Sequence, residues 1–73
     1  MTLVDATKYM ALNQLLLWMQ ERGSSVRLTW IVGAWECEWV VDGERYVGIH
    51  PNPDQAVRNA VAEAQAAEEV KHG

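Results

Sequence analysis

The 73-residue sequence has too few of some residue types to use several common ways of stabilising a small domain. It has a single cysteine, Cys37, so an intramolecular disulfide is excluded. One cysteine and two separated histidines also do not provide the four ligands of a structural zinc ion. A chain of this length buries only a modest share of its surface on folding. It must therefore depend on efficient packing or on association with another chain.

Basic residues are also few, and they are scattered along the chain. Six Lys and Arg stand against ten Asp and Glu, which gives a net charge of −4. Nucleic-acid-binding proteins neutralise phosphates with clustered basic side chains, so we expect no direct contact with nucleic acid. The same negative charge disfavours anionic membranes. There is no apolar run of ~20 residues, as a membrane span needs, and no secretory signal, so we expect a cytoplasmic protein.

Hydrophobic spacing predicts a first helix over residues 5–22, with Asp5 as its N-cap and Gly23 just after its end. Apolar residues at helical spacing would form its inner stripe: Tyr9, Leu12, Leu15, Leu16, Trp18 and Met19. Met10 and Leu17 would lie on the polar side, one heptad apart. They are either ordinary exposed apolar residues or a contact seam for a partner or a second copy.

Two segments of alternating polarity, residues 26–32 and 35–41, predict a β-hairpin with its apolar residues on one face. Gly33-Ala34 between them suits a two-residue turn of type II′. This turn would pair apolar residues with one another across the two strands: Val32 with Trp35, Trp30 with Cys37, Leu28 with Trp39 and Val26 with Val41.

Asp42-Gly43 predicts a second turn, which leads into a third strand over residues 44–50. A two-residue turn would bring the even-numbered residues of this strand to the core side: Glu44, Tyr46 and Gly48. A three-residue loop with a glycine bulge would bring Val47 and Ile49 there instead. We favour the second arrangement because it buries two β-branched residues, and it leaves Tyr46 on the outer face.

Asn52-Pro53-Asp54-Gln55 predicts the start of a second helix, with asparagine as the cap and proline at the first helical position. The helix would run to about residue 70, and Lys71 and His72 suit its negative end. Its inner stripe consists of small residues: Val57, Ala60, Val61, Ala64 and Ala67. This helix can therefore approach the sheet closely.

The expected fold is a single α+β domain over residues 1–73, with the element order α-β-β-β-α. A three-stranded antiparallel meander would carry both helices on one face. The outer face of the sheet would be half exposed, mixed in character and net acidic.

No group of residues indicates catalysis, a metal or a cofactor. Cys37 lies between two carboxylates, has no base or cation beside it to activate the thiol, and is expected in the core. Glu36 and Glu38 share a strand face ~7 Å apart, but nothing supplies the further ligands of a metal ion. The four tryptophans are expected in the core rather than as a stacking platform for bases. We therefore expect no enzymatic activity.

The segment WECEWVVDGERYVGIHPNPDQAVRNAVAEA resembles small phage and prophage proteins of the phage ABA-sandwich type, over about residues 35–66. The shared features are a tryptophan that opens a strand, a short hairpin, and an Ala-rich helix that begins with proline. The resemblance implies a phage-borne accessory protein. Small acidic proteins of that kind inhibit host machines, such as CRISPR effectors, by occupying their surfaces.

The α-β-β-β-α order is also similar to that of double-stranded-RNA-binding domains. Those domains carry a lysine-rich run at the start of the last helix. Here the same stretch reads PNPDQAVRNA, in which Arg58 is the one basic residue. The RNA-binding chemistry is therefore not carried over.

The expected function is a non-catalytic protein-binding module. It would be an anti-CRISPR-like inhibitor from a phage or mobile element that sterically blocks a host nucleoprotein machine through an acidic surface. Its partner would be a host protein or complex, met in the bacterial cytoplasm. Residues of the outer sheet face would form the recognition surface: Glu36, Glu38, Glu44 and Tyr46. Met10 and Leu17 would form a second contact or a dimer seam. The alternative is a structural or assembly protein that acts through homo-oligomerisation.

Overall fold

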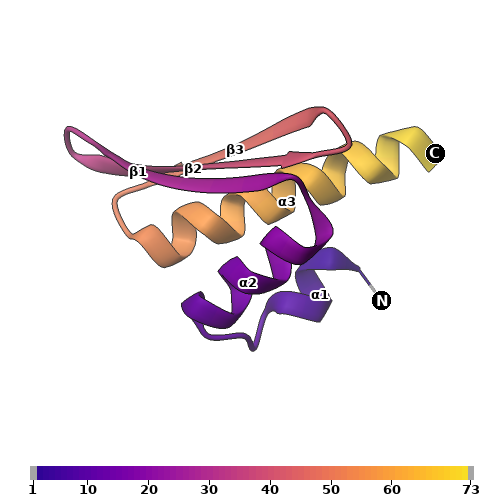
Figure 1. Ribbon diagram of the computed structural model, residues 1–73, viewed down its shortest axis with the longest axis horizontal. Coiled ribbons are helices and arrows are strands. Elements are labelled where there is room, and N and C mark those ends of the chain that lie inside the picture. Colours follow the sequence, from indigo (N-terminus) through magenta and orange to yellow (C-terminus); the bar gives the residue numbers. More distant parts are fainter. Residues whose placement is uncertain (1, 73) are drawn as a thin grey trace.

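The computed structural model describes residues 2–72, without the side chains of Lys71 and His72. The role predicted for those two side chains therefore lies outside the described part of the chain. The elements follow in the order α1-α2-β1-β2-β3-α3 (Figure 1). Their bounds are α1 Leu3–Thr7, α2 Leu12–Arg22, β1 Ser25–Ile31, β2 Ala34–Val41, β3 Glu44–His50 and α3 Pro53–His72.

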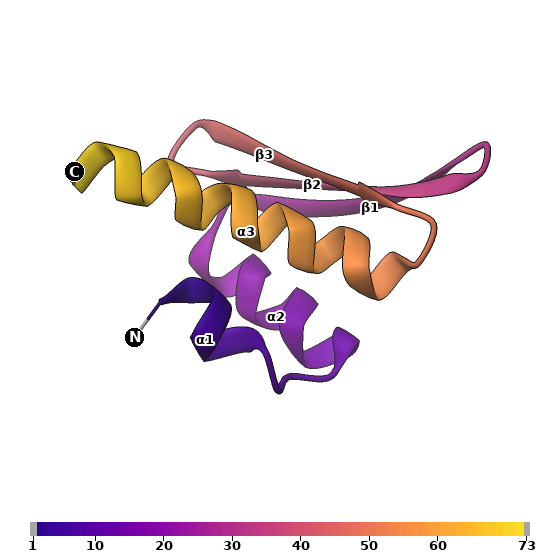
Figure 2. The same ribbon diagram turned by 180° about the vertical axis from the view of Figure 1, so that it is seen from behind.

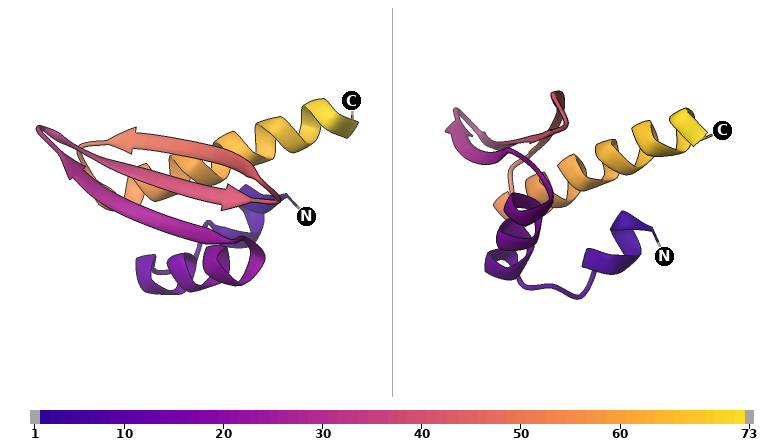
Figure 3. Two further views of the ribbon diagram at one scale, coloured as in Figure 1. Left: turned by 45° about the horizontal axis from the view of Figure 1, so that its top comes forward. Right: turned by 45° about the vertical axis from the view of Figure 1, so that its right-hand side comes forward.

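The strands form an open antiparallel sheet in the order β1-β2-β3, and the helices all lie on one side of it (Figures 1 and 2). Helix α3 packs across β3 and β2, α2 packs against β1, and α1 packs against α3. Figure 3 shows the opposite face of the sheet, which no described helix covers. The predicted α+β fold, a three-stranded meander with its helices on one face, is confirmed.

The core lies between the sheet and the helices. Its buried residues come from α2, β2 and α3: Leu15, Met19, Cys37, Trp39, Ala56, Val57, Ala60, Val61 and Ala64. The small-residue stripe predicted for the last helix is confirmed, except that Ala67 is only half buried. The cap of this helix is confirmed as well, because the Asn52 side chain accepts the N–H of Asp54 at 2.9 Å.

The single helix predicted over residues 5–22 is wrong, because the chain forms two helices joined by a link at residues 8–11. The cause lies in the distant helix α3. The Arg58 guanidinium donates to the carbonyl of Thr7 at 3.0 Å and to that of Met10 at 2.6 Å. It thereby satisfies backbone acceptors that the ends of short helices leave free.

This break changes the environment of several residues. Thr2 rather than Asp5 caps the first helix, since the Thr2 hydroxyl accepts the Asp5 N–H at 3.0 Å. Tyr9, predicted in the inner stripe, lies in the link and is 90% exposed. Met10, predicted on the polar side of a helix, also lies in the link and packs half-buried against the core.

The first two strands pair two residues away from the predicted register. Val32-Gly33 forms the loop, and the observed pairs are Ile31 with Ala34, Trp30 with Trp35, Leu28 with Cys37 and Val26 with Trp39. Glycine occupies the second loop position with φ 86°, as in a type II turn, instead of the first position of a type II′ turn. A shift of two residues keeps every side chain on its predicted face, but it moves Val32 to the hairpin tip.

The three-residue loop favoured between the second and third strands is also wrong. Asp42 and Gly43 form a two-residue turn with φ 52° and 79°, as type I′ requires. The turn brings Glu44, Tyr46 and Gly48 to the helix side. Burial of Gly48 explains this choice: a Cβ there would lie 2.5 Å from the Ala60 nitrogen and closer still to the carbonyl oxygen of Ala56.

Candidate functional site

The uncovered sheet face differs in composition from the predicted recognition surface. It carries the residues that alternate with the core positions: Arg27, Thr29, Ile31, Glu36, Glu38, Val40, Arg45, Val47 and Ile49. Glu44 and Tyr46, predicted on this face, lie on the helix side instead, because the two-residue turn reverses the parity of β3. Two arginines and two glutamates remain, so the face is charge-balanced rather than net acidic.

The two glutamates of this face have different environments. The Glu38 carboxylate forms an ion pair with Arg45, with Nε 2.8 Å from Oε2, and the Glu38 side chain is only 21% exposed. Glu36 lies between Thr29 and Ile49 on the neighbouring strands. Within residues 2–72 the structure gives Glu36 no ion pair. Glu38 therefore serves the sheet itself, whereas Glu36 stays available to another molecule.

Large apolar side chains are exposed at the tip of the β1–β2 hairpin, which projects beyond the ends of the helices (Figures 1 and 2). Val32 is 98% exposed, Trp30 55% and Ile31 45%, and the nearby Ile49 of β3 is 57% exposed. We call these four residues the hairpin-tip patch. The patch extends over both faces of the hairpin, because Trp30 lies on the helix side, where its ring meets that of Trp35 at 5.3 Å.

Sequence reasoning missed the hairpin-tip patch, because the predicted register paired Val32 and Trp30 with apolar partners. The signal that would have found it is the loop itself. Gly33 serves a two-residue turn equally well in the second position, and that choice places Val32 in the loop.

Met10 and Leu17 do not share one helix, as the predicted second contact or dimer seam assumes. Leu17 is 59% exposed on α2, whereas Met10 lies in the link before that helix and packs against the core. The heptad relation between them requires one continuous helix, but the helix is interrupted at residues 8–11, between α1 and α2.

Cys37 has the environment of a structural residue. Its side chain is fully buried, and burial raises the pKa of its thiol to about 11. A thiol protonated at neutral pH and closed to solvent is a poor nucleophile. Among the described residues, no three His, Cys, Asp or Glu side chains are grouped so that they could hold a metal ion.

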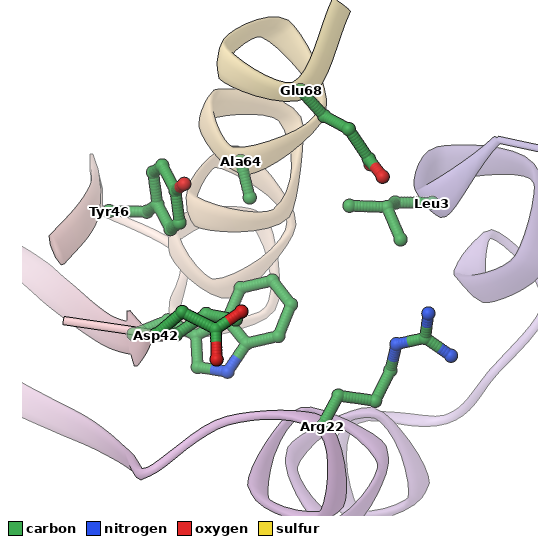
Figure 4. A pocket seen from close by; sticks show the side chains of 8 residues that line it. Leu3, Arg22, Asp42, Tyr46, Ala64 and Glu68 are labelled. Atoms are coloured by element: carbon green, nitrogen blue, oxygen red, sulfur yellow. The ribbon is translucent and has the colours of Figure 1, made fainter. Parts of the chain in front are cut away.

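A pocket of about 350 Å³ opens at the other end of the sheet, between the β2–β3 turn and the three helices (Figure 4). It is lined by apolar, aromatic and charged residues: Leu3, Arg22, Trp39, Val41, Asp42, Tyr46, Ala64 and Glu68. Tyr46 therefore belongs to this pocket rather than to the outer sheet face. A shallower hollow of about 440 Å³ lies between β3 and α3, around Gly48 and Asn59.

The negative charge of the protein lies away from the uncovered sheet face. That face is neutral, and Asp54 pairs with Arg58 at 3.0 Å within α3. Exposed carboxylates gather instead on the β2–β3 turn and on the second half of α3: Asp42, Glu44, Glu63, Glu68 and Glu69. The apolar tip and the acidic end are thus at opposite ends of the molecule.

Comparisons with known proteins give no family for this chain. In residues 2–72 no helix combines the length and the apolar character needed to cross a membrane. No protein-family model, no curated protein and no solved structure matches the sequence or the fold.

Proposed function

We propose that the protein is a non-catalytic binding module that docks its β1–β2 hairpin tip on another protein. The hairpin-tip patch carries this proposal. Several large exposed apolar side chains gathered at one end of a small domain are typical of an interaction surface. Tryptophan is also enriched among the residues that dominate binding energy, and Trp30 is more than half exposed.

The shape of the hairpin tip favours a foreign partner over a second copy. A two-fold dimer needs a self-complementary surface, whereas the tip is a projecting feature that fits a concave one. Its four apolar side chains are also too few to bury the roughly 1,000 Å² that a stable interface requires by themselves. We infer a partner with an apolar cleft that receives the tip and adjoining sheet face, and a basic residue at its rim that faces Glu36.

An inhibitor of a host nucleoprotein machine, of phage or mobile-element origin, is the narrower proposal. The outer sheet face does not support an acidic blocking surface, because its positive and negative charges balance. The exposed carboxylates of the β2–β3 turn and α3 support it at the other end, because such a surface complements a basic nucleic-acid channel. On this narrower proposal, the hairpin tip would anchor the protein while its acidic end blocks the channel.

The proposal is tested by capture of partners from a bacterial host lysate on the tagged full chain and on three variants. Val32→Glu and Ile49→Glu each place a charge in the hairpin-tip patch. Val70→Glu makes the same change at an apolar residue that is 80% exposed near the end of α3. We expect a protein retained by the wild type and by the Val70 variant, and lost with both variants of the patch.

Two results would contradict the proposal. One is a partner that all three variants retain equally. The other is a concentration-dependent dimer, seen by light scattering at micromolar concentration, that Val32→Glu dissociates. The second result would favour the assembly protein that acts through homo-oligomerisation.

A further inference from the structure

The pocket beside the β2–β3 turn is lined by charged groups from separate elements. Asp42 comes from the turn, Glu68 from α3 and Arg22 from the end of α2. Figure 4 shows Glu68 and Arg22 extending on one side of the pocket, beside Leu3, and Asp42 on the other side with Tyr46. Small-molecule and side-chain sites have this construction, an apolar hollow with a few convergent polar groups.

The charges around this pocket are not matched with one another. Within the described residues, neither Asp42 nor Glu68 forms an ion pair, and Arg22 forms none with them. The Arg22 guanidinium lies instead over the ring of Trp18, 4.8 Å from its centre. The lining thus holds two negative charges and one positive charge that is already stacked on an aromatic face, which leaves an excess of one negative charge.

The uncharged part of the lining completes the site. The Trp39 indole uses its N–H on the Met19 carbonyl at 2.9 Å, so it offers the pocket an aromatic surface and no donor. The Tyr46 ring lies 6.4 Å from that indole, and its hydroxyl has no hydrogen-bond partner in the described chain. A guest in the pocket would meet aromatic surface, one hydroxyl, two carboxylates and the Arg22 guanidinium, which is stacked on Trp18.

We propose that this pocket binds a guanidinium group. A cation is favoured because the lining has an excess of negative charge. A guanidinium is favoured over an ammonium because its planar fork has five donors and can bond several acceptors of the lining at once. Its flat face also stacks on aromatic rings, whereas an ammonium is compact and strongly hydrated. The site is independent of the hairpin tip at the other end of the sheet.

The proposal is tested by NMR titration of the ¹⁵N-labelled full chain at constant ionic strength. The reporters are the indole N–H of Trp39 and the backbone amide of Tyr46. The probes are methylguanidinium, methylammonium and acetate, together with Nα-acetyl-arginine N-methylamide. We expect saturable shifts with methylguanidinium in the millimolar range typical of fragments, weaker binding of methylammonium and no saturation with acetate.

Three variants separate this site from general attraction to an acidic protein. Asp42→Asn keeps the turn, because asparagine tolerates positive φ, and Glu68→Gln changes an exposed helix position. Each should weaken the binding of methylguanidinium about three- to tenfold, because the amide keeps an acceptor and only replaces a charge-assisted hydrogen bond by a neutral one. Glu69→Gln removes the same charge one residue away from the pocket lining and should leave the affinity unchanged.

The comparison of guanidinium probes identifies the source of the group. Tighter binding of the arginine derivative indicates an arginine side chain of a partner protein, and equal binding indicates a free guanidinium compound. The proposal is overturned if no probe saturates or if methylammonium binds as tightly as methylguanidinium. It is also overturned if Glu69→Gln weakens binding as much as Glu68→Gln, or if acetate gives saturable shifts that Arg22→Gln abolishes.

Discussion

Among single residues, Trp39 connects the two layers of the fold. Its indole is 2% exposed and donates to the Met19 carbonyl, so the sheet is tied to the backbone of α2 by a buried hydrogen bond. The ring also lies 5.8 Å from that of Trp18 and 6.4 Å from that of Tyr46. A large part of the core therefore depends on the central strand, which contributes the buried Cys37 and Trp39.

Cys37, in the same strand, makes stability depend on alkaline pH. Burial raises the pKa of its thiol from 9.0 to about 11. Above pH 9 the unfolded chain releases this proton and the folded chain keeps it, so the free energy of unfolding falls as the pH rises from about 9 to about 11. We expect the wild type to lose roughly 2 kcal/mol over this range relative to Cys37→Ala, measured by urea denaturation. If the free energy of unfolding had the same pH dependence in both proteins, the thiol would have the same pKa in the folded and the unfolded chain, which would contradict the raised pKa.

Gly48 permits the close approach of α3 to β3. A Cβ at this position would meet the backbone of Ala56 and Ala60, which cannot move without displacing the helix. We expect Gly48→Ala to lower the free energy of unfolding by at least ~2 kcal/mol, measured by chemical denaturation. Gly43→Asn is the matched control, because nothing lies within 4 Å of a Cβ there and asparagine tolerates the observed φ of 79°. Equal stability of the Gly48 variant and the wild type would refute the packing described here.

Among the elements, α3 organises both the sheet and the N-terminal helices. One face of α3 packs on β2 and β3, and its side chains reach α1. Gln65 accepts the Val4 N–H at 2.9 Å, and Arg58 binds the carbonyls at the end of α1 and in the link. Hydrogen bonds to α3 therefore help to hold the short α1, which has only five residues.

Arg58 can be separated from ordinary surface charges by substitution. Arg58→Gln removes two hydrogen bonds to backbone carbonyls and an ion pair with Asp54, at a side chain that is 24% exposed. We expect a loss of about 2–3 kcal/mol in the free energy of unfolding, together with faster hydrogen exchange in α1. Arg45→Gln removes the more exposed ion pair with Glu38 and should cost about 0.5–1 kcal/mol. Similar losses in both variants would mean that Arg58 does not hold α1.

The sequence allowed prediction of the order of the elements and of the faces of β1, β2 and α3, but not of the strand register, the face of β3 or the break in the first helix. Alternation placed Cys37 and Trp39 on the core face, where they are buried, because parity survives any shift by two residues. The register depended on which residues form the loop, and the position of Gly33 left that open. The turn before β3 depended on Gly48, whose small size matters only once α3 lies against it. The break in the first helix depended on Arg58, 48 residues from Met10 in sequence.

The candidate site followed from these offsets, so it was the part least open to prediction. Glu44 and Tyr46 lie on the helix side because the parity of β3 differs from the prediction. Val32 lies at the exposed hairpin tip because the register of the first hairpin differs from the prediction. Of the four predicted recognition residues, Glu36 lies on the outer face as predicted and forms no ion pair with the described residues. Its role in binding stays a prediction.

As a whole, the molecule has two ends of different character. One end carries the exposed apolar residues of the hairpin tip, and the other carries the exposed carboxylates around the pocket. The sheet connects them and presents a neutral face to solvent. This arrangement fits the proposal that the hairpin tip binds a partner protein while the acidic end faces a basic surface of that partner.

Val32→Glu should separate binding from folding. Val32 is 98% exposed in a loop, so a charged side chain there should change the free energy of unfolding by no more than about 0.5 kcal/mol. Thermal and chemical denaturation of the wild type and the variant would measure this difference. A large destabilisation would place Val32 in a packed environment and contradict the observed register.

The most direct test of the account is the affinity of the captured partner for the wild type, for Val32→Glu and for Val70→Glu, measured by calorimetry. A charge placed in a hot-spot cleft costs at least about tenfold in affinity. We therefore expect binding to weaken by that factor or more in the Val32 variant and to stay within about twofold in the Val70 variant. Equal affinities in the wild type and the Val32 variant would contradict docking through the hairpin tip.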